Sequence, residues 1–518
     1  MKTEVLYGID IGSTSIRCCV YDLHANMLNQ ASRPTYLINS ANEGQSKGSL
    51  LWDPVFLWKV VREIIHESTT CLPVDQFHPL GIATSSVGCT FVIIDKAGNN
   101  LFPIFRSQQN VPKLLNQYEK KYSGNEFQNI TGYPLSSTSA GFILAQLKES
   151  YPEEFSKIGT IFPLSNYIAY QMTGEKVSDR SIAASFGLWD HRINSWFTEL
   201  LRDLSLEPEN FGTLISGGQV IGNINKNVSD ITGLPVGLPV FSGGHDYLCA
   251  AMATGCYQPG QIFNIEGTFE IIATFHQTPV VKTLMDSTRS LLDLHIMPQV
   301  YSLMVERVGA SQIEWMKNLL LPSGEDHKND WDNIFSKLDT IYENTTEMEI
   351  FIPHVFGKLF PEYEEDRRGA IIGIGGSSTG SSIMKSAIFS HCFESKRMVD
   401  YQQQFSPTPI NQIITVGGIT RSKYWMQTKA NILGIKLLVP KAKELSALGA
   451  AFLAGKGLEV FTSFQQIGEV ALSQGVSKYI PDSAKVELYS EYLQNTYLPV
   501  LKRIEEIDNI MSRNSKRE

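Results

Sequence analysis

Two segments of the chain share one pattern, in which an apolar strand, a turn with glycine and hydroxyl residues, and a second strand follow each other directly. The first occupies residues 5–21, with the turn Gly12-Ser13-Thr14-Ser15. The second occupies residues 262–274, with the turn Glu266-Gly267-Thr268. This order predicts a β-hairpin in each place. If each hairpin opens a domain, the fold is internally duplicated; two unrelated hairpins are the alternative interpretation.

Strand and helix patterns alternate after the first hairpin. Asp53-Pro54 predicts a helix start, because aspartate is a favoured N-cap and proline fits the first helical position. The apolar residues that follow have helical spacing: Leu57, Val60, Val61, Ile64 and Ile65. Strands are predicted at 79–86 and 91–94. Such alternation up to about residue 203 predicts α/β layers, and 518 residues suffice for two to four domains.

The composition excludes several classes of protein. The chain has 44 Lys+Arg and 53 Asp+Glu, so 44 − 53 gives a formal charge of −9. The sequence has no block of basic residues, which argues against a nucleic-acid partner. No uncharged apolar run reaches the ~18 residues of a membrane span, and the N-terminus lacks the apolar core of a signal peptide. Seven scattered cysteines argue against a disulfide framework and a zinc site. We expect a cytoplasmic globular enzyme.

The first hairpin carries a candidate phosphate and metal site. Asp10 ends the first strand, and Gly12, Ser13 and Thr14 form the turn. Glycine lets backbone N–H groups approach a phosphate closely, and hydroxyls add donors. A carboxylate here can hold Mg²⁺ or its waters, and Arg17 adds positive charge nearby. A plain hairpin with an aspartate in its turn is the alternative interpretation.

A second candidate site is the segment Gly243-Gly244-His245-Asp246, which is expected to be a glycine loop after a buried strand. A carboxylate at a strand end can face a cleft and take a proton from a substrate hydroxyl. The alternative is that Asp246 caps the helix that begins near Tyr247. His245 is interpreted as a hydrogen-bonded structural histidine.

The third segment starts at Gly417-Gly418, after the strand 413–416, and ends at Gly434. The two glycines are expected to open a helix, whose N-terminal amides suit a phosphate or a nucleotide. Gly434 is a plausible C-terminal stop. An ordinary strand–glycine–helix crossover is the alternative interpretation.

These three segments, in this order, resemble the FGGY family of carbohydrate kinases. Residues 234–240, 351–357, 368–370 and 444–451 extend the resemblance, which covers about residues 5–501. The family shares its architecture with actin, hexokinase and Hsp70. The resemblance therefore implies an α/β fold of two ribonuclease-H-like domains with a cleft between them. It further implies a sugar-side domain over 1–254, a nucleotide-side domain over 255–518 with a helical tail from about 485, and a possible homodimer.

The resemblance also implies roles for individual residues. Asp246 would be the general base, and Asp10 and Asp246 would hold Mg²⁺ through water. ATP and its phosphates would lie on Gly12, Ser13, Thr14, Arg17, Gly267, Thr268, Gly417, Gly418, Arg421 and Asn431. The carbohydrate would lie on Ser86, Gly88, Gln108, Gln109, Asp246 and Tyr247.

The substrate side departs from the common family pattern. The run 105–110 replaces a Trp-x-Asp-x-Arg segment, and 85–89 replaces a Gln-x-His-Gly segment. Tyr247, Phe269 and Ser382 also stand where other residue types are frequent. These changes leave Asp246 and the ATP side intact, but they leave the identity of the sugar open.

The resemblance implies an ATP-dependent kinase that phosphorylates a hydroxyl of a small sugar, polyol or sugar acid, with a xylulose-like ketose favoured. A nucleotide-binding regulator of the same fold that has lost turnover is the alternative. The presence of both Asp10 and Asp246 favours the kinase. A filament or chaperone of the same fold would not account for the Gly-Gly-His-Asp segment.

Overall fold

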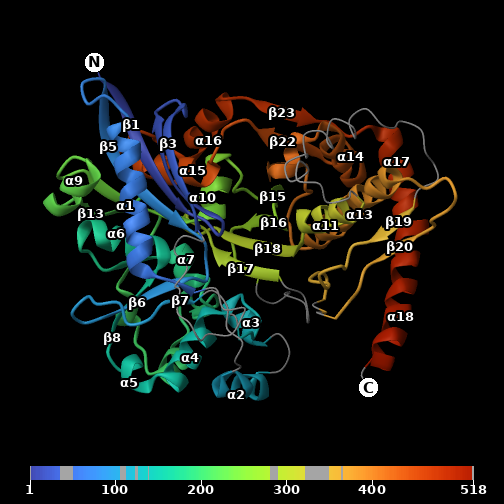
Figure 1. Cartoon of the computed structure of the whole chain (residues 1–518), viewed down its shortest axis with the longest axis horizontal. Coiled ribbons are helices and arrows are strands. Elements are labelled where there is room, and N and C mark those ends of the chain that lie inside the picture. The colour runs from blue at the N-terminus through green and yellow to red at the C-terminus, as the bar shows by residue number, and fades with distance from the viewer. Residues whose placement is uncertain are drawn as a thin grey trace.

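Two mixed β-sheets form the frame of the molecule (Figure 1). The computed structural model describes residues 2–35, 51–105, 112–122, 126–137, 139–280, 290–320, 349–362, 364 and 366–515. The six strands of the first sheet are, in spatial order, β13 (Val220–Asn223), β14 (Pro239–His245), β5 (Phe77–Ser86), β1 (Thr3–Ile11), β2 (Ser15–Asp22) and β3 (Met27–Pro34). The seven strands of the second sheet are β17 (Ser290–Leu294), β18 (Tyr301–Val308), β16 (Phe269–His276), β15 (Gln261–Glu266), β21 (Gln412–Gly417), β22 (Lys436–Pro440) and β23 (Val476–Tyr479).

The two sheets share a core of five strands with the same relative directions. In the first sheet β1, β2 and β3 form an antiparallel meander, and β5 and β14 continue from β1 in parallel. In the second sheet β15, β16 and β18 form the meander, and β21 and β22 continue from β15 in parallel. An antiparallel edge strand, β13 or β23, follows in each case. The two predicted hairpins are therefore equivalent, and the expected pair of ribonuclease-H-like domains is confirmed.

Helices and short strand pairs complete the two halves. The helices up to residue 253 are α1 (Pro54–Thr70), α2 (Lys113–Lys121), α3 (Glu126–Thr131), α4 (Ala140–Ser150), α5 (Pro152–Phe155), α6 (Leu164–Thr173), α7 (Arg180–Ala184), α8 (Thr198–Leu204), the 3-10 helix η2 (Pro208–Phe211), α9 (Lys226–Thr232) and α10 (Asp246–Ala253). The short pairs are β4 (Leu51–Trp52) with β7 (Ile104–Phe105), β6 (Phe91–Asp95) with β8 (Ile158–Pro163), β9 (Val177–Asp179) with β12 (Thr213–Ile215), β10 (Trp189–Asp190) with β11 (Ser195–Trp196), and β19 (Ile350–Ile352) with β20 (Ala370–Ile372).

The second half ends in a run of helices. They are α11 (Ala310–Leu320), α13 (Gly380–Gln403), the 3-10 helix η4 (Gly418–Arg421), α14 (Lys423–Leu433), α15 (Leu445–Gly457), α16 (Phe464–Ser473), α17 (Ser483–Tyr492), the π-helical turn η5 (Leu493–Tyr497) and α18 (Leu498–Ser515). Within the described residues, none of the helices combines the length and the apolar character that crossing a membrane requires.

Helix α1 forms as its local sequence predicts. Asp53 Oδ1 accepts hydrogen bonds from the backbone N–H groups of Val55, at 2.7 Å, and Phe56, at 3.3 Å, and Pro54 occupies the first helical position. The five predicted apolar residues are all buried: Leu57, Val60, Val61, Ile64 and Ile65. Burial of this face holds the helix on the first sheet.

Helices α10 and α15 lie between the two sheets (Figure 1). Although α15 comes late in the chain, it packs directly on the first sheet. A Cβ atom added to Gly8 of β1 would lie 1.9 Å from the carbonyl oxygen of Ala447. One hydrophobic core joins both helices to strands of both sheets, through Leu6, Leu248, Leu448 and Phe263. This packing brings the start of α10 and the start of α15 to the first hairpin.

Candidate active site

Asp10 lies at the end of β1, where three strands of the first sheet meet. It is paired with Arg17 across the hairpin and with Ser85 on the parallel strand β5. Ser85 Oγ donates to Asp10 Oδ1 at 3.3 Å, and Arg17 Nη1 lies 3.7 Å from Asp10 Oδ2. Arg17 Nε also lies 3.1 Å from Glu444 Oε2, just before α15. The first hairpin is thus tied to the second half of the chain by charge.

The turn after Asp10 is open to solvent. Gly12 N–H donates to Ser15 O at 3.0 Å, which closes the turn, while Ser13 and Thr14 are exposed. Thr35 Oγ1 donates to Gly12 O at 3.1 Å and supports the turn from behind. A small, exposed and internally braced turn of this kind lets backbone N–H groups approach an anion.

Asp246 is the first residue of α10, directly after β14. Its Oδ1 accepts a hydrogen bond from Tyr247 N–H at 2.7 Å and contacts His245 Nδ1 at 2.8 Å. His245 is paired with Ser86 on β5, one residue beyond the Ser85 that contacts Asp10. The expected glycine loop is wrong, because β14 continues through Gly243 and Gly244 to His245, with an irregularity after Ser242.

Asp10 and Asp246 interact electrostatically. Burial and, next, the charge of Asp246 raise the pKa of Asp10 to about 8, while Arg17 opposes the shift. Two carboxylates that repel each other beside a polar turn form a donor set that suits Mg²⁺, which prefers oxygen ligands and retains several waters. The residues present therefore fit the magnesium site that the family resemblance implies.

Ser86 and Gly88, two of the predicted substrate residues, lie against His245. A Cβ atom on Gly88 would lie 2.2 Å from His245 Nε2, so only glycine leaves room for this ring. Ser86 is fully buried; its hydroxyl donates to Val87 O at 3.1 Å and accepts from Ser165 N–H at 3.2 Å. A substrate contact by either residue stays a prediction.

Tyr247 is connected through hydrogen bonds to Asp293 and Tyr133, two residues that the sequence analysis did not identify. Its hydroxyl donates to Asp293 Oδ2 at 2.8 Å, and the Tyr133 hydroxyl donates to Asp293 Oδ1 at 2.5 Å. Asp293 is fully buried on β17 of the second sheet, whereas both tyrosines belong to the first half. This carboxylate therefore joins the two halves beside Asp246. The only sequence signal is one acidic residue within the apolar run of β17.

The second hairpin turn and the Gly417-Gly418 segment lie side by side. Glu266, at the end of β15, is paired with Gly417 at the end of the parallel strand β21. The N–H groups of Gly309 and Ala310 donate to the carbonyl oxygens of Thr268 and Gly267, each at 2.9 Å. Two of the predicted nucleotide segments thus lie together at the carboxyl ends of β15 and β21, two neighbouring strands of the second sheet.

The helix after Gly417-Gly418 starts later than expected. A 3-10 turn, η4, covers 418–421, and α14 begins at Lys423 with Ser422 as its N-cap. Arg421 Nε donates to Gly418 O at 3.3 Å. Asn431 is buried, and its Oδ1 accepts from Asp482 N–H at 2.9 Å and from Gln427 Nε2 at 3.0 Å. The helix stops at Gly434 in the left-handed conformation, as predicted.

The remaining predicted substrate residues, Gln108 and Gln109, lie outside the described residues. The candidate site that the structure does describe has two parts. One part is the carboxylate pair Asp10 and Asp246 at the edge of the first sheet. The other is the pair of glycine segments at the edge of the second sheet.

Comparison with known proteins identifies this arrangement. The N-terminal domain of the FGGY family of carbohydrate kinases matches residues 5–253, and the C-terminal domain of that family matches residues 277–458. Among curated proteins, an L-fuculokinase of Escherichia coli O157:H7 is 24% identical over 467 residues, which cover 89% of this chain and 94% of that protein. An autoinducer-2 kinase of Escherichia coli K12 is 24% identical over 514 residues, covering 94% of this chain and 92% of that protein.

Solved structures show the same fold. The crystal structure of xylulose kinase from Rhodospirillum rubrum superposes with a TM-score of 0.85 at 22% identity, and the match covers 98% of this chain and 100% of that one. The two-domain architecture, the paired hairpins and both domain matches all indicate the same family. The chain therefore belongs to the FGGY family of carbohydrate kinases, which transfer a phosphoryl group from ATP to a sugar.

Proposed function

We propose that this kinase phosphorylates a hydroxyl of a small sugar or polyol, with a xylulose-like ketose favoured. The observation that carries the proposal is that Asp10, at the end of β1, and Asp246, directly after β14, lie on either side of the end of β5. A sugar acid is ranked below a ketose, because its carboxylate would lie near that of the buried Asp293, which Tyr133 and Tyr247 hold beside Asp246. The names of the similar proteins, L-fuculokinase and xylulose kinase, support a ketose.

Asp246 has one oxygen for the reaction. Since Oδ1 is held by Tyr247 N–H and His245, Oδ2 is the oxygen that would take the proton from the attacking hydroxyl. Phosphoryl transfer then requires positioning and charge neutralisation more than covalent chemistry. A magnesium ion at Asp10 and Asp246 would supply neutralisation. The exposed turn of Ser13 and Thr14 would lie under the terminal phosphates.

The nucleotide would occupy the edge of the second sheet. Gly267 and Thr268 would hold phosphates, and Gly417, Gly418, Arg421 and Asn431 would line the nucleoside side. We further propose that the domains divide at 254/255, between α10 and β15, and that the enzyme works in the cytoplasm. Homodimer formation also stays a proposal.

A coupled ADP-release assay tests the substrate. Xylulose, fuculose, glycerol and gluconate are compared at equal concentrations with MgATP. We expect the fastest ADP release with a ketose and the slowest with gluconate. Fastest release with gluconate would overturn the choice of substrate class. Absence of release with every sugar, while MgATP still binds, would favour the regulator that lacks turnover.

Gly88→Ala is expected to lower kcat by roughly tenfold to a hundredfold, because the new methyl displaces the His245 ring that contacts Asp246. The double variant Gly88→Ala/His245→Ala provides the control. In the His245→Ala background, the ring that clashes is gone, so adding Gly88→Ala should change kcat little. Equal effects of Gly88→Ala in both backgrounds would show that the glycine acts through another contact.

A further inference from the structure

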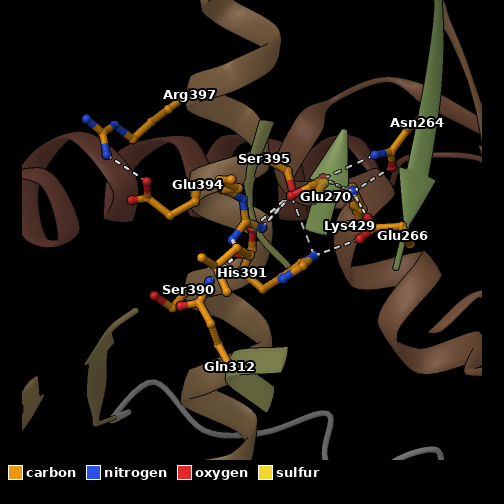
Figure 2. A network of polar contacts seen from close by, with 12 residues as sticks. Asn264, Glu266, Glu270, Gln312, Ser390, His391, Glu394, Ser395, Arg397 and Lys429 are labelled. Atoms are coloured by element: carbon orange, nitrogen blue, oxygen red, sulfur yellow. Dashed lines mark hydrogen bonds and ion pairs between the residues drawn. The ribbon is translucent and has the colours of Figure 1, made fainter. Parts of the chain in front are cut away.

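A charged network is completely buried inside the second half, behind the second hairpin (Figure 2). Lys429 of α14 donates to Asn264 Oδ1 at 2.8 Å and to Glu270 Oε1 at 2.6 Å, and it also pairs with the Glu266 carboxylate. Asn264 and Glu266 lie on β15, and Glu270 lies on β16. One lysine therefore holds both strands of the hairpin whose turn is Gly267-Thr268.

Two further elements join the network. Arg307 of β18 pairs with Glu270 and donates to His391 O at 2.8 Å, and Ser395 Oγ of α13 donates to Glu270 Oε1 at 2.7 Å. His391 Nε2 contacts Glu266 Oε2 at 3.0 Å. Three strands and two helices thus meet at a single cluster of charges. This number of partners fixes the position of each element against the others.

The cluster resembles a metal site in its spacing but not in its charge. Ligand atoms of Glu266, Glu270 and His391 lie within 4.8 Å of one another. However, Lys429 and Arg307 supply two positive charges for the two glutamates. Burial would raise the pKa of Glu270, but Arg307 and Lys429 hold it well below its usual range. A divalent cation would add charge to a cluster that is already balanced, so we read the cluster as an ion-pair network.

Stability alone does not explain why ions are buried in this core. Taking ions out of water costs several kcal/mol per ion, and apolar residues of similar volume often stabilise a fold equally well. Buried ionic groups are better suited to fixing one geometry, because each requires its partners at defined positions. The geometry fixed here is that of the hairpin turn and of the elements beside it.

The position of Glu266 shows which segments the network holds in place. It directly precedes Gly267-Thr268, its side chain contacts Lys429 and His391, and its backbone is paired with Gly417 of the neighbouring glycine segment. Lys429 itself lies on the helix that follows Gly417-Gly418. The network therefore connects both segments to which the proposed function assigns the nucleotide.

We propose that Lys429 is a positioning residue for ATP, which holds the Gly267-Thr268 turn and the Gly417-Gly418 segment in the relative position that the nucleotide requires. The inference rests on the proposed placement of ATP. It does not depend on which sugar is the substrate, because sugar binding is assigned to the first half. Loss of Lys429 should therefore weaken ATP binding and leave sugar binding nearly unchanged.

The experiment measures the Kd of MgATP by calorimetry in the absence of sugar, together with the KM values for ATP and for the best sugar of the assay. Lys429→Met is expected to raise the Kd and KM of ATP about tenfold or more, because errors in positioning of about 1 Å are costly. The KM of the sugar should change by less than about threefold. Lys429→Arg, which keeps the charge, should retain part of the ATP affinity.

Lys358→Met is the matched control. Lys358 is also buried in the second half and also has three oxygen partners, which are here the carboxylates of Glu362, Glu364 and Glu505, at 2.9–3.0 Å. None of these three belongs to the hairpin or to α14. Lys358→Met should lower the melting temperature as Lys429→Met does, but leave the Kd of MgATP unchanged. An equal rise in that Kd for both variants would overturn the proposal, since it would then reflect general loosening.

A double variant separates positioning from stability. Lys429→Met/Glu270→Gln removes one charge of each sign, so it should recover much of the melting temperature lost in Lys429→Met. It should not recover the ATP affinity, because the tie between α14 and the hairpin is still missing. Recovery of both would show that Lys429 only neutralises buried carboxylates. If wild-type protein itself fails to bind MgATP, the proposed function fails and not merely this inference.

Discussion

Asp246→Asn is expected to reduce sugar-dependent ADP release by about 10²- to 10⁴-fold, the range typical for loss of a general base. An amide has nearly the same shape as a carboxylate, but it cannot take the proton of the attacking hydroxyl. Oδ1 would still accept the hydrogen bond from Tyr247 N–H, so the start of α10 should be preserved. The measurement is kcat in the coupled assay, with MgATP binding followed separately by calorimetry.

Asp230→Asn is a suitable control, because Asp230 is an exposed carboxylate on α9 that pairs only weakly with Lys226 at 3.0 Å. Its kcat should equal that of the wild type within experimental error. Asp246→Asn with more than about a tenth of wild-type kcat would contradict the assignment of Asp246 as the base. Catalysis would then depend on positioning and phosphate neutralisation alone.

Gly8→Ala is expected to lower the free energy of unfolding by roughly 3 kcal/mol, at the upper end of the usual cost of overpacking. The added methyl carbon would lie 1.9 Å from a backbone oxygen of α15, which no side-chain rotation can relieve. Either β1 or α15 must move, and Asp10 lies two residues further along β1. Urea unfolding followed by fluorescence measures the loss.

Gly375→Ala is the corresponding control, since a Cβ atom there would have no neighbour within 4 Å. The free energy of unfolding of this variant should lie within about 0.5 kcal/mol of the wild type, as for most surface substitutions. Should Gly8→Ala unfold at the same urea concentration as Gly375→Ala, the contact between β1 and α15 would have to be looser than described.

The sequence predicted the parts of the fold that local patterns encode. Helix α1 has an N-cap at Asp53 and five buried residues at helical spacing, and both features can be read within the single segment 53–65. The two hairpins were found for the same reason. The start of α14 was misjudged by several residues, because a 3-10 turn and the Ser422 cap intervene after the glycines.

Candidate site residues could be proposed from the sequence where they lie at or just after the end of a strand in a short motif, as Asp10, Gly267 and Gly417 do. Residues whose partners lie far away in the sequence could not be identified in this way. Asp293 meets Tyr133, 160 residues earlier, and Lys429 meets Asn264, 165 residues earlier. Such contacts depend on how the two halves and their helices pack, and neither residue forms part of a local motif. A buried lysine also contradicts the expectation from its residue type.

The placement of α15 affects how the protein is made. The first sheet is covered by a helix that the ribosome completes only at Gly457, which is 457 − 253 = 204 residues after α10 ends. At about 5–20 residues per second, this delay is roughly 10–40 s. During this time the apolar surface that α15 later covers is exposed on the nascent chain, where chaperones or other nascent chains can bind it. The first half to be synthesised therefore completes its core only after most of the second half has been made.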